Sequence, residues 1–141
     1  MRPAPWLLTA AVAVSLVACT PTSEDAAGRP AATVQRVAGS AQARVTLTAE
    51  AARHLGVETE RARPASERRV FVPYAAVLYD PAGRTWVYTN PEPLVFVRQV
   101  IDVDDIRGSW ALVNSGPAAG TSVVTVGASE LLGVEYEVGE E

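Results

Sequence analysis

The chain has 141 residues, with 12 basic and 16 acidic side chains and a formal charge of -4. This length corresponds to one domain. The single Cys and single His exclude a disulfide framework and a Cys/His zinc site within the chain. The acidic excess argues against nucleic acid as a partner. With 48% hydrophobic residues, the composition is that of a globular protein.

The N-terminus has the features of an export signal. Arg2 precedes an apolar run at residues 6–17, which is too short to span a bilayer, since spanning needs about 20 residues. The run ends in LVAC at residues 16–19, which resembles a bacterial lipobox. This implies that residues 1–18 are a lipoprotein signal peptide and that Cys19 is lipidated. The alternative is an ordinary secretory peptide with a free thiol. We expect a protein anchored by lipid at the extracytoplasmic face of the cell membrane.

The mature chain divides into a tether and a domain. Residues 19–42 are rich in Ala, Ser, Thr, Gly and Pro and lack apolar periodicity, which predicts a flexible tether behind the lipidated Cys19. Residues 43–141 then form the folded domain.

Short β-strand patterns account for most of this domain. The predicted strands lie at residues 44–47, 57–63, 69–72, 75–79, 85–89, 94–103, 110–114, 122–126 and, at an edge, 136–138. Thr48 caps a predicted helix at 49–55, which ends at Gly56, and a second helical turn is predicted at 128–132. The pattern predicts an all-β fold, a small β-roll or barrel of about seven short strands with one or two short helices.

Two turns and one alternating strand organise the predicted core. The tetrapeptide DPAG at residues 80–83 predicts a β-hairpin, and residues 104–109 predict a turn. In the strand at 94–103, the face that begins at Val95 is the more apolar and is predicted to point into the core. The predicted core residues are Val45, Leu47, Val77, Val87, Val97, Ile101, Leu112, Val124 and Val126, with Trp86 and Trp110 covering the ends.

Several motifs occur in an order typical of one family. They are VPYAAVLY at residues 72–79, WVY at 86–88, GPAAGTSVV at 116–124 and GASEL at 127–131, preceded by a strand and helix within 45–59. Together they resemble the membrane-proximal domain of periplasmic adaptor subunits, also called membrane fusion proteins, of resistance–nodulation–division efflux pumps. Pro117 stands where that family usually has Leu.

The resemblance implies a function but only part of the usual architecture. Full adaptors insert a barrel, a lipoyl-like domain and a helical hairpin, for which the short stretch between Thr59 and Val72 has no room. In the family, the first and last segments pair with each other. The resemblance therefore implies a non-catalytic, adaptor-like or accessory subunit of an efflux or export transporter, with a permease as its partner. A homo-oligomer is compatible with this interpretation.

The sequence lacks motifs for catalysis or for a cofactor. His54 has no predicted nucleophile or carboxylate partner, so it is interpreted as a structural or solvent-facing residue. Asp102, Asp104 and Asp105 do not match a calcium loop, so a solvated turn is the preferred interpretation. We therefore predict a protein that is not an enzyme and that holds neither a metal nor a cofactor.

Two groups of side chains are candidates for binding a partner. Arg61, Arg63, Arg68 and Arg69 form a basic stretch, which is either a solvated surface or a contact with anionic lipid headgroups or an acidic patch on a permease.

Tyr74, Tyr79, Trp86 and Tyr88 cluster around the predicted hairpin, where they form either a binding face or part of the core. The alternative function is a lipoprotein of the cell envelope that binds a small ligand or glycan. A pocket lined by Trp86, Tyr88 and Trp110 would favour that alternative.

Overall fold

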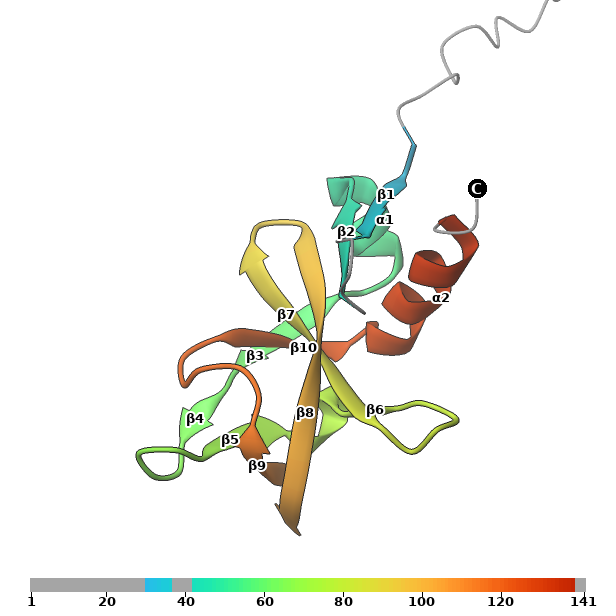
Figure 1. Cartoon of the computed structure of the whole chain (residues 1–141). Coiled ribbons are helices and arrows are strands. Elements are labelled where there is room, and N and C mark those ends of the chain that lie inside the picture. The colour runs from blue at the N-terminus through green and yellow to red at the C-terminus, as the bar shows by residue number, and fades with distance from the viewer. Residues whose placement is uncertain (1–29, 37–41, 139–141) are drawn as a thin grey trace, which may run out of the picture.

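The computed structural model describes residues 30–36 and 42–138, and its main feature is a nearly closed, seven-stranded antiparallel β-barrel with two helices (Figure 1). The barrel order is β3-β10-β7-β8-β9-β5-β4. The strands are β3 (Glu58–Arg61), β10 (Ser122–Val126), β7 (Thr85–Glu92), β8 (Val95–Arg107), β9 (Trp110–Ser115), β5 (Val70–Pro73) and β4 (Arg63–Pro64). The predicted fold class is confirmed.

One residue between β3 and β4 brings the two ends of the barrel together. Ala62 is buried, its backbone N–H donates to Thr121 O at 2.9 Å, and its carbonyl accepts from Gly120 N at 2.8 Å. These bonds satisfy backbone groups that would otherwise be buried without partners. The segment predicted as one strand at 57–63 is therefore split into two short strands.

The long strand β8 corrects one predicted turn. It continues through Asp104 and Asp105 and pairs with β9 up to Arg107↔Trp110. The turn follows at Gly108, whose φ of 61° suits glycine. The predicted turn at 104–109 is thus shorter than expected.

The predicted hairpin is present in a modified form. The 3₁₀ helix η1 (Tyr74–Ala76) replaces the start of the predicted strand, which leaves only β6 (Leu78–Tyr79) to pair with β7. The turn that joins them is held by Asp80, whose side chain accepts from the backbone N–H groups of Ala82 and Arg84. An aspartate bonded to the backbone in this way is a common device of turns.

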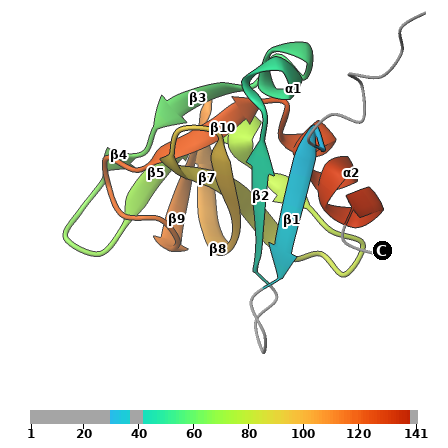
Figure 2. The same ribbon diagram turned by 90° about the horizontal axis from the view of Figure 1, so that it is seen from above.

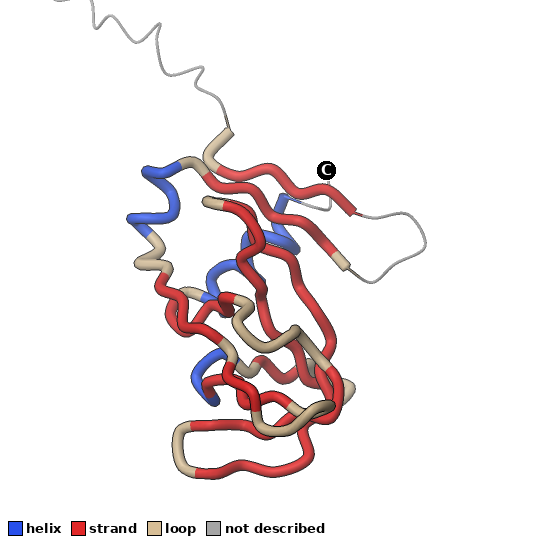
Figure 3. The backbone as a smooth tube through the Cα atoms, turned by 90° about the vertical axis from the view of Figure 1, so that its left-hand side faces the viewer, coloured by secondary structure: helices blue, strands red, loops and turns tan. Residues whose placement is uncertain are grey.

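A second layer lies beside the barrel and is joined to it through β2 (Ala43–Leu47), which pairs antiparallel with β8 at Val45↔Phe96. It consists of β1 (Ala32–Arg36), β2, α1 (Ala49–His54) and α2 (Ala128–Val138), and Figures 2 and 3 show the β1–β2 pair next to the barrel and close to α2. β1 pairs antiparallel with β2, so the prediction of a tether as far as residue 42 is wrong for residues 32–36. The prediction for α1 is confirmed, because Thr48 Oγ1 accepts from Ala51 N at 3.1 Å.

The helix α2 replaces the edge strand predicted at 136–138. Its buried face contains Ala128, Leu131 and Glu135, which recur at helical spacing. The alternation of apolar and acidic residues at 136–138 favoured a strand. Packing of the helical face against the barrel outweighs this local preference.

Two hydrophobic clusters form the core. One fills the barrel and includes Val72, Val87, Ile101 and Val123, while the other lies between the barrel, β2 and α2 and includes Val45, Tyr88, Phe96, Val124 and Leu131. Seven of the nine predicted core residues are buried; the exceptions are Val97, which is half-buried, and Val126, which is 46% exposed.

The second cluster explains an error in the predicted faces of β8. Ile101 points into the barrel as predicted. Phe96 and Arg98, on the face that was predicted to be outward, are also buried. The layer formed by β2 and α2 covers that face, so alternation alone could not identify a single buried side.

Candidate functional site

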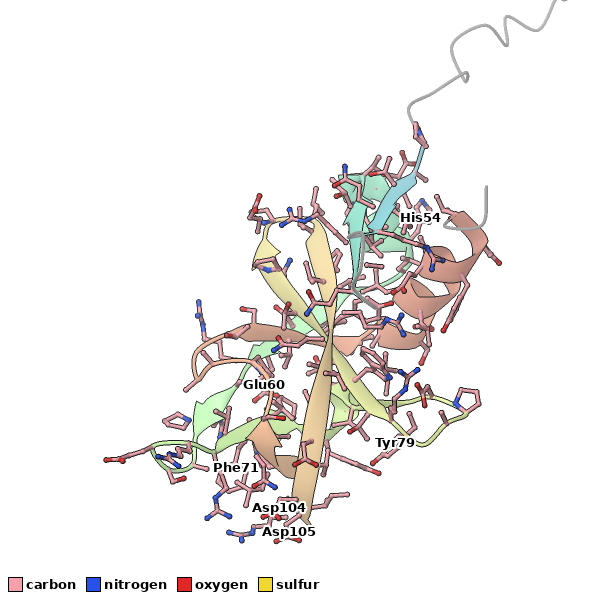
Figure 4. The ribbon with its side chains drawn as sticks, viewed as in Figure 1. His54, Glu60, Phe71, Tyr79, Asp104 and Asp105 are labelled. Atoms are coloured by element: carbon pink, nitrogen blue, oxygen red, sulfur yellow. The ribbon has the colours of Figure 1, made fainter. Side chains whose placement is uncertain are left out.

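Arginine and aromatic side chains gather at the end of the barrel away from β1. We call this the Arg63–Trp110 surface and define it by Arg63, Phe71, Tyr74, Arg107 and Trp110. The pairings Arg63↔Phe71 and Arg107↔Trp110 place these residues side by side on adjoining strands. Figure 4 shows Phe71 at this end.

Stacking of arginines on aromatic rings organises this surface. The Arg63 guanidinium carbon lies 4.0 Å from the centroid of the Trp110 ring, and that of Arg107 lies 6.0 Å from the centroid of Phe71. Such contacts contribute about 0.5–1 kcal/mol each when exposed. Two hollows, of about 190 and about 550 Å³, meet at Arg63 and Trp110.

Two of the four arginines in the predicted basic stretch pair with acidic side chains. Arg63 Nη2 lies 3.1 Å from Glu60 Oε1 and Arg69 Nη1 lies 3.3 Å from Asp104 Oδ2. Arg61 Nη1 donates to the carbonyl of Gly120. Since all these groups are exposed, the ion pairs contribute little stability, but they prevent a concentrated positive potential.

Arg107 Nε is likewise paired with Asp105 Oδ2, at 2.9 Å, and Arg68 is exposed. The hydrogen bonds from Arg107 and from the backbone N–H of Ile106 lower the pKa of Asp105. Figure 4 shows Asp104 and Asp105 together at the far end of β8. The aspartates therefore lie on a strand and interact with arginines, where the sequence had suggested a solvated turn.

The four aromatic residues near the hairpin do not form one face. Tyr88 is completely buried and Trp86 is 4% exposed, whereas Tyr74 and Tyr79 are 41% and 54% exposed. A hydrogen bond with Tyr74 raises the pKa of Tyr79. Of the two alternatives, part of the core or a binding face, the first applies to Tyr88 and Trp86, which are buried. Tyr74 and Tyr79 remain accessible to a partner.

Trp86, Tyr88 and Trp110 do not line a common pocket. Trp110 borders the two hollows of the Arg63–Trp110 surface, while Trp86 borders a cavity beside α2. The pocket expected for the small-ligand alternative is therefore not formed by this trio.

A buried polar triad, which the sequence did not predict, attaches α2 to the barrel. The Tyr88 hydroxyl donates to Glu135 Oε2 at 2.6 Å, and Arg98 Nη2 lies 2.8 Å from Glu135 Oε1. Burial, together with the hydrogen bond and charge of Glu135, raises the pKa of Tyr88. The only sequence indication was the helical spacing of Glu135 from Leu131, which the strand-like alternation concealed.

A cavity of about 340 Å³ lies between the β6–β7 hairpin and α2. Its lining residues are Leu78, Tyr79, Asp80, Pro81, Trp86, Arg98, Leu132 and Tyr136. We call it the α2 cavity. The triad borders it, since the Arg98 guanidinium carbon lies 4.5 Å from the centroid of the Trp86 ring.

Asp80 fixes the hairpin wall of the α2 cavity. Its carboxylate accepts from Arg84 Nε at 2.7 Å and from Trp86 Nε1 at 3.2 Å. Burial alone would raise its pKa, but hydrogen bonds from the Arg84 backbone, the Trp86 indole and the Arg84 guanidinium outweigh burial and lower it. The indole ring is therefore held in place by a charged acceptor.

Other predicted sites are placed as follows. His54 is exposed, with Nε2 3.7 Å from Glu50 Oε1, and Figure 4 shows it at the end opposite Asp105. Within residues 30–36 and 42–138, no group of three or more His, Cys, Asp or Glu residues could hold a metal ion. Cys19, with its predicted lipid, lies outside the described residues.

No described helix is long and apolar enough to cross a membrane.

Comparison with known proteins gives no relative for this chain. No protein-family model matches it, and neither a curated protein nor a solved structure is similar to it.

Proposed function

We propose that this protein is a non-catalytic, lipid-anchored subunit that docks onto the permease of an efflux or export transporter, as an adaptor-like or accessory component. The observation that carries the proposal is the Arg63–Trp110 surface. Arginine, tryptophan and tyrosine dominate the binding energy of protein interfaces, and this surface presents all three around two adjoining hollows.

The balance of charge supports a protein partner over a lipid one. Binding to anionic headgroups relies on several unpaired basic residues, each contributing about 1 kcal/mol. Here Arg63, Arg69 and Arg107 each have an acidic partner within 3.3 Å. Exposed ion pairs of this kind can exchange partners at little cost, which suits an interface with mixed charges.

The position of the predicted anchor supports the same conclusion. β1 begins at Ala32, 13 positions after Cys19 (32 minus 19), so the linking chain could extend at most about 45 Å. β1 lies at the opposite end of the molecule from β4, β5 and β9, which carry Arg63, Phe71 and Trp110 (Figure 1). A surface turned away from the anchor would meet the extramembrane part of a permease more readily than lipid.

The arrangement of the chain ends agrees with the resemblance to adaptors. β3, from the first part of the domain, pairs with β10, from the last part, at Ser122↔Arg61. α2 packs beside β1 and β2. This pairing supports an interpretation as a membrane-proximal domain without the inserted segments of full adaptors.

The proposal can be tested by cross-linking in intact cells at native expression. The protein would be captured after mild detergent extraction, and co-purifying proteins identified by mass spectrometry. We expect a polytopic permease with the unmodified protein and its loss in the variants Trp110→Ala and Arg63→Glu. Arg53→Glu, on the exposed helix α1, is the matched control and should retain the partner.

Two results would contradict the proposal in different ways. Absence of any permease with the unmodified protein would refute the transporter function itself. Capture of a permease that survives both Trp110→Ala and Arg63→Glu, while Arg53→Glu abolishes it, would place the dock at α1 instead.

A further inference from the structure

The α2 cavity has the size and the walls of a small-molecule site. Its volume of about 340 Å³ falls at the lower end of the range for ligand pockets, roughly 300–1,000 Å³. Leu78, Pro81 and Trp86 from the hairpin face Leu132 and Tyr136 from α2 across it. Figure 4 shows Tyr79 at this side of the barrel, away from Phe71.

The walls of the cavity are held before any ligand arrives. The Trp86 ring is fixed by its hydrogen bond to Asp80 and by the guanidinium of Arg98. Arg98 is itself fixed by Glu135 on α2. Pre-organised walls reduce the entropy that binding would otherwise cost.

The charges around the cavity cancel. Asp80 is paired with Arg84 at 2.7 Å, and Glu135 is paired with Arg98 at 2.8 Å. A charged ligand would lose part of its hydration and would have to compete with one of these pairs. The side chains of Asp80, Arg98 and Glu135 are at most 11% exposed, which makes that competition costly. The charge pattern therefore favours an uncharged ligand.

The one carboxylate that lines the cavity has little hydrogen-bonding capacity left for a sugar. The Asp80 carboxylate already accepts four hydrogen bonds, from Ala82, Trp86 and both the backbone and side chain of Arg84. Glycan recognition needs many such groups, because each buried hydroxyl left without a partner costs free energy. Aromatic and aliphatic walls instead suit a flat apolar molecule.

We propose that the α2 cavity binds an uncharged, planar and largely apolar small molecule. The walls formed by Trp86, Tyr136 and Leu132 contact its rings. No residue that defines the Arg63–Trp110 surface lines the cavity, so the inference does not depend on docking to a permease, and each proposal can fail without the other.

The test uses two fluorescent probes that differ in one charged group. N-phenyl-1-naphthylamine is uncharged, and 8-anilino-1-naphthalenesulfonate carries the same rings with an added sulfonate. Both are titrated against the full chain with Cys19→Ser, which would remove the predicted lipid and its need for detergent. For about 17 non-hydrogen atoms we expect the uncharged probe to bind with a Kd of about 10–200 μM, and the sulfonate to bind at least about tenfold more weakly.

Variants on α2 locate the binding site. Leu132→Trp fills the cavity and should weaken the uncharged probe about tenfold or more, whereas Glu137→Trp, on the exposed side of the same helix, should change its Kd less than about twofold. Should Leu132→Trp fail to fold, Tyr136→Ala removes an exposed wall and should weaken binding about two- to tenfold.

Four outcomes would overturn the proposal. Three of them are no saturable binding of the uncharged probe, equal or tighter binding of the sulfonate, and equal effects of Leu132→Trp and Glu137→Trp. The fourth is a decrease in binding of the uncharged probe as the protein concentration rises. That result would assign the cavity to a contact with a second copy of the chain.

Discussion

Replacing Glu135 by Gln removes one charge from the buried triad while keeping the shape of the side chain. At the 2.8 Å separation of Arg98 Nη2 and Glu135 Oε1, an effective dielectric constant of about 20 gives an attraction of about 6 kcal/mol. Desolvation costs several kcal/mol for each ion, so the intact pair contributes little net stability. Glu135→Gln leaves the desolvated Arg98 without its counter-ion, and we expect a loss of about 3–5 kcal/mol.

The assay is urea unfolding followed by tryptophan fluorescence and circular dichroism. Glu137→Gln lies on the exposed side of the same helix and should change the free energy of unfolding by less than about 0.5 kcal/mol. The double variant Arg98→Met, Glu135→Leu removes both charges, which alone would be neutral or stabilising by up to about 4 kcal/mol. It also leaves the buried Tyr88 hydroxyl without its acceptor, which costs about 1–3 kcal/mol, so we expect the double variant to be more stable than Glu135→Gln. A loss below about 1 kcal/mol in Glu135→Gln, or a double variant as unstable as the single one, would refute this reasoning.

Two further predictions concern Tyr88, the third member of the triad, and the glycines at the start of α2 and within it. Because burial and Glu135 raise the pKa of Tyr88 above its ordinary value of about 10, the folded state keeps a proton that the unfolded chain loses. Stability is therefore retained below about pH 10 and lost above it. Between about pH 10 and 11 the unmodified protein should lose about 1 kcal/mol more than Tyr88→Phe in urea unfolding, and equal losses would contradict the assignment. Gly127 has a φ of 83°, and an added Cβ would lie 3.2 Å from Leu55 O, so Gly127→Ala should destabilise by about 1–2 kcal/mol. Gly133→Ala, in open space within the same helix, should stabilise by about 0.5–1 kcal/mol. Thermal unfolding would check both glycine variants, and similar shifts for the two would contradict the role of the positive φ.

Short-range patterns in the sequence determine several parts of this protein. Thr48 caps α1 through a residue three positions away, and Asp80 closes the hairpin through residues two and four positions away. Such interactions depend on local spacing, so the sequence alone predicts them. The alternation of apolar residues in short segments likewise determined the all-β class.

Tertiary packing decided the features of both candidate sites. The strand-like alternation at the C-terminus became a helix, because Glu135 meets Tyr88 and Arg98 on strands far away in the sequence. Residues 32–36, with the composition of a tether, became a strand because β2 offered an edge.

The two tryptophans Trp86 and Trp110 also differ through tertiary packing and not through their local sequence. Trp86 and Trp110 have similar strand-like surroundings in the sequence, but one lines the α2 cavity and the other stacks on Arg63 at the far end of the barrel. A residue's local pattern gives its preferred backbone state. Its partners depend on how the barrel closes and on which face the second layer covers, and only the tertiary structure contains that information.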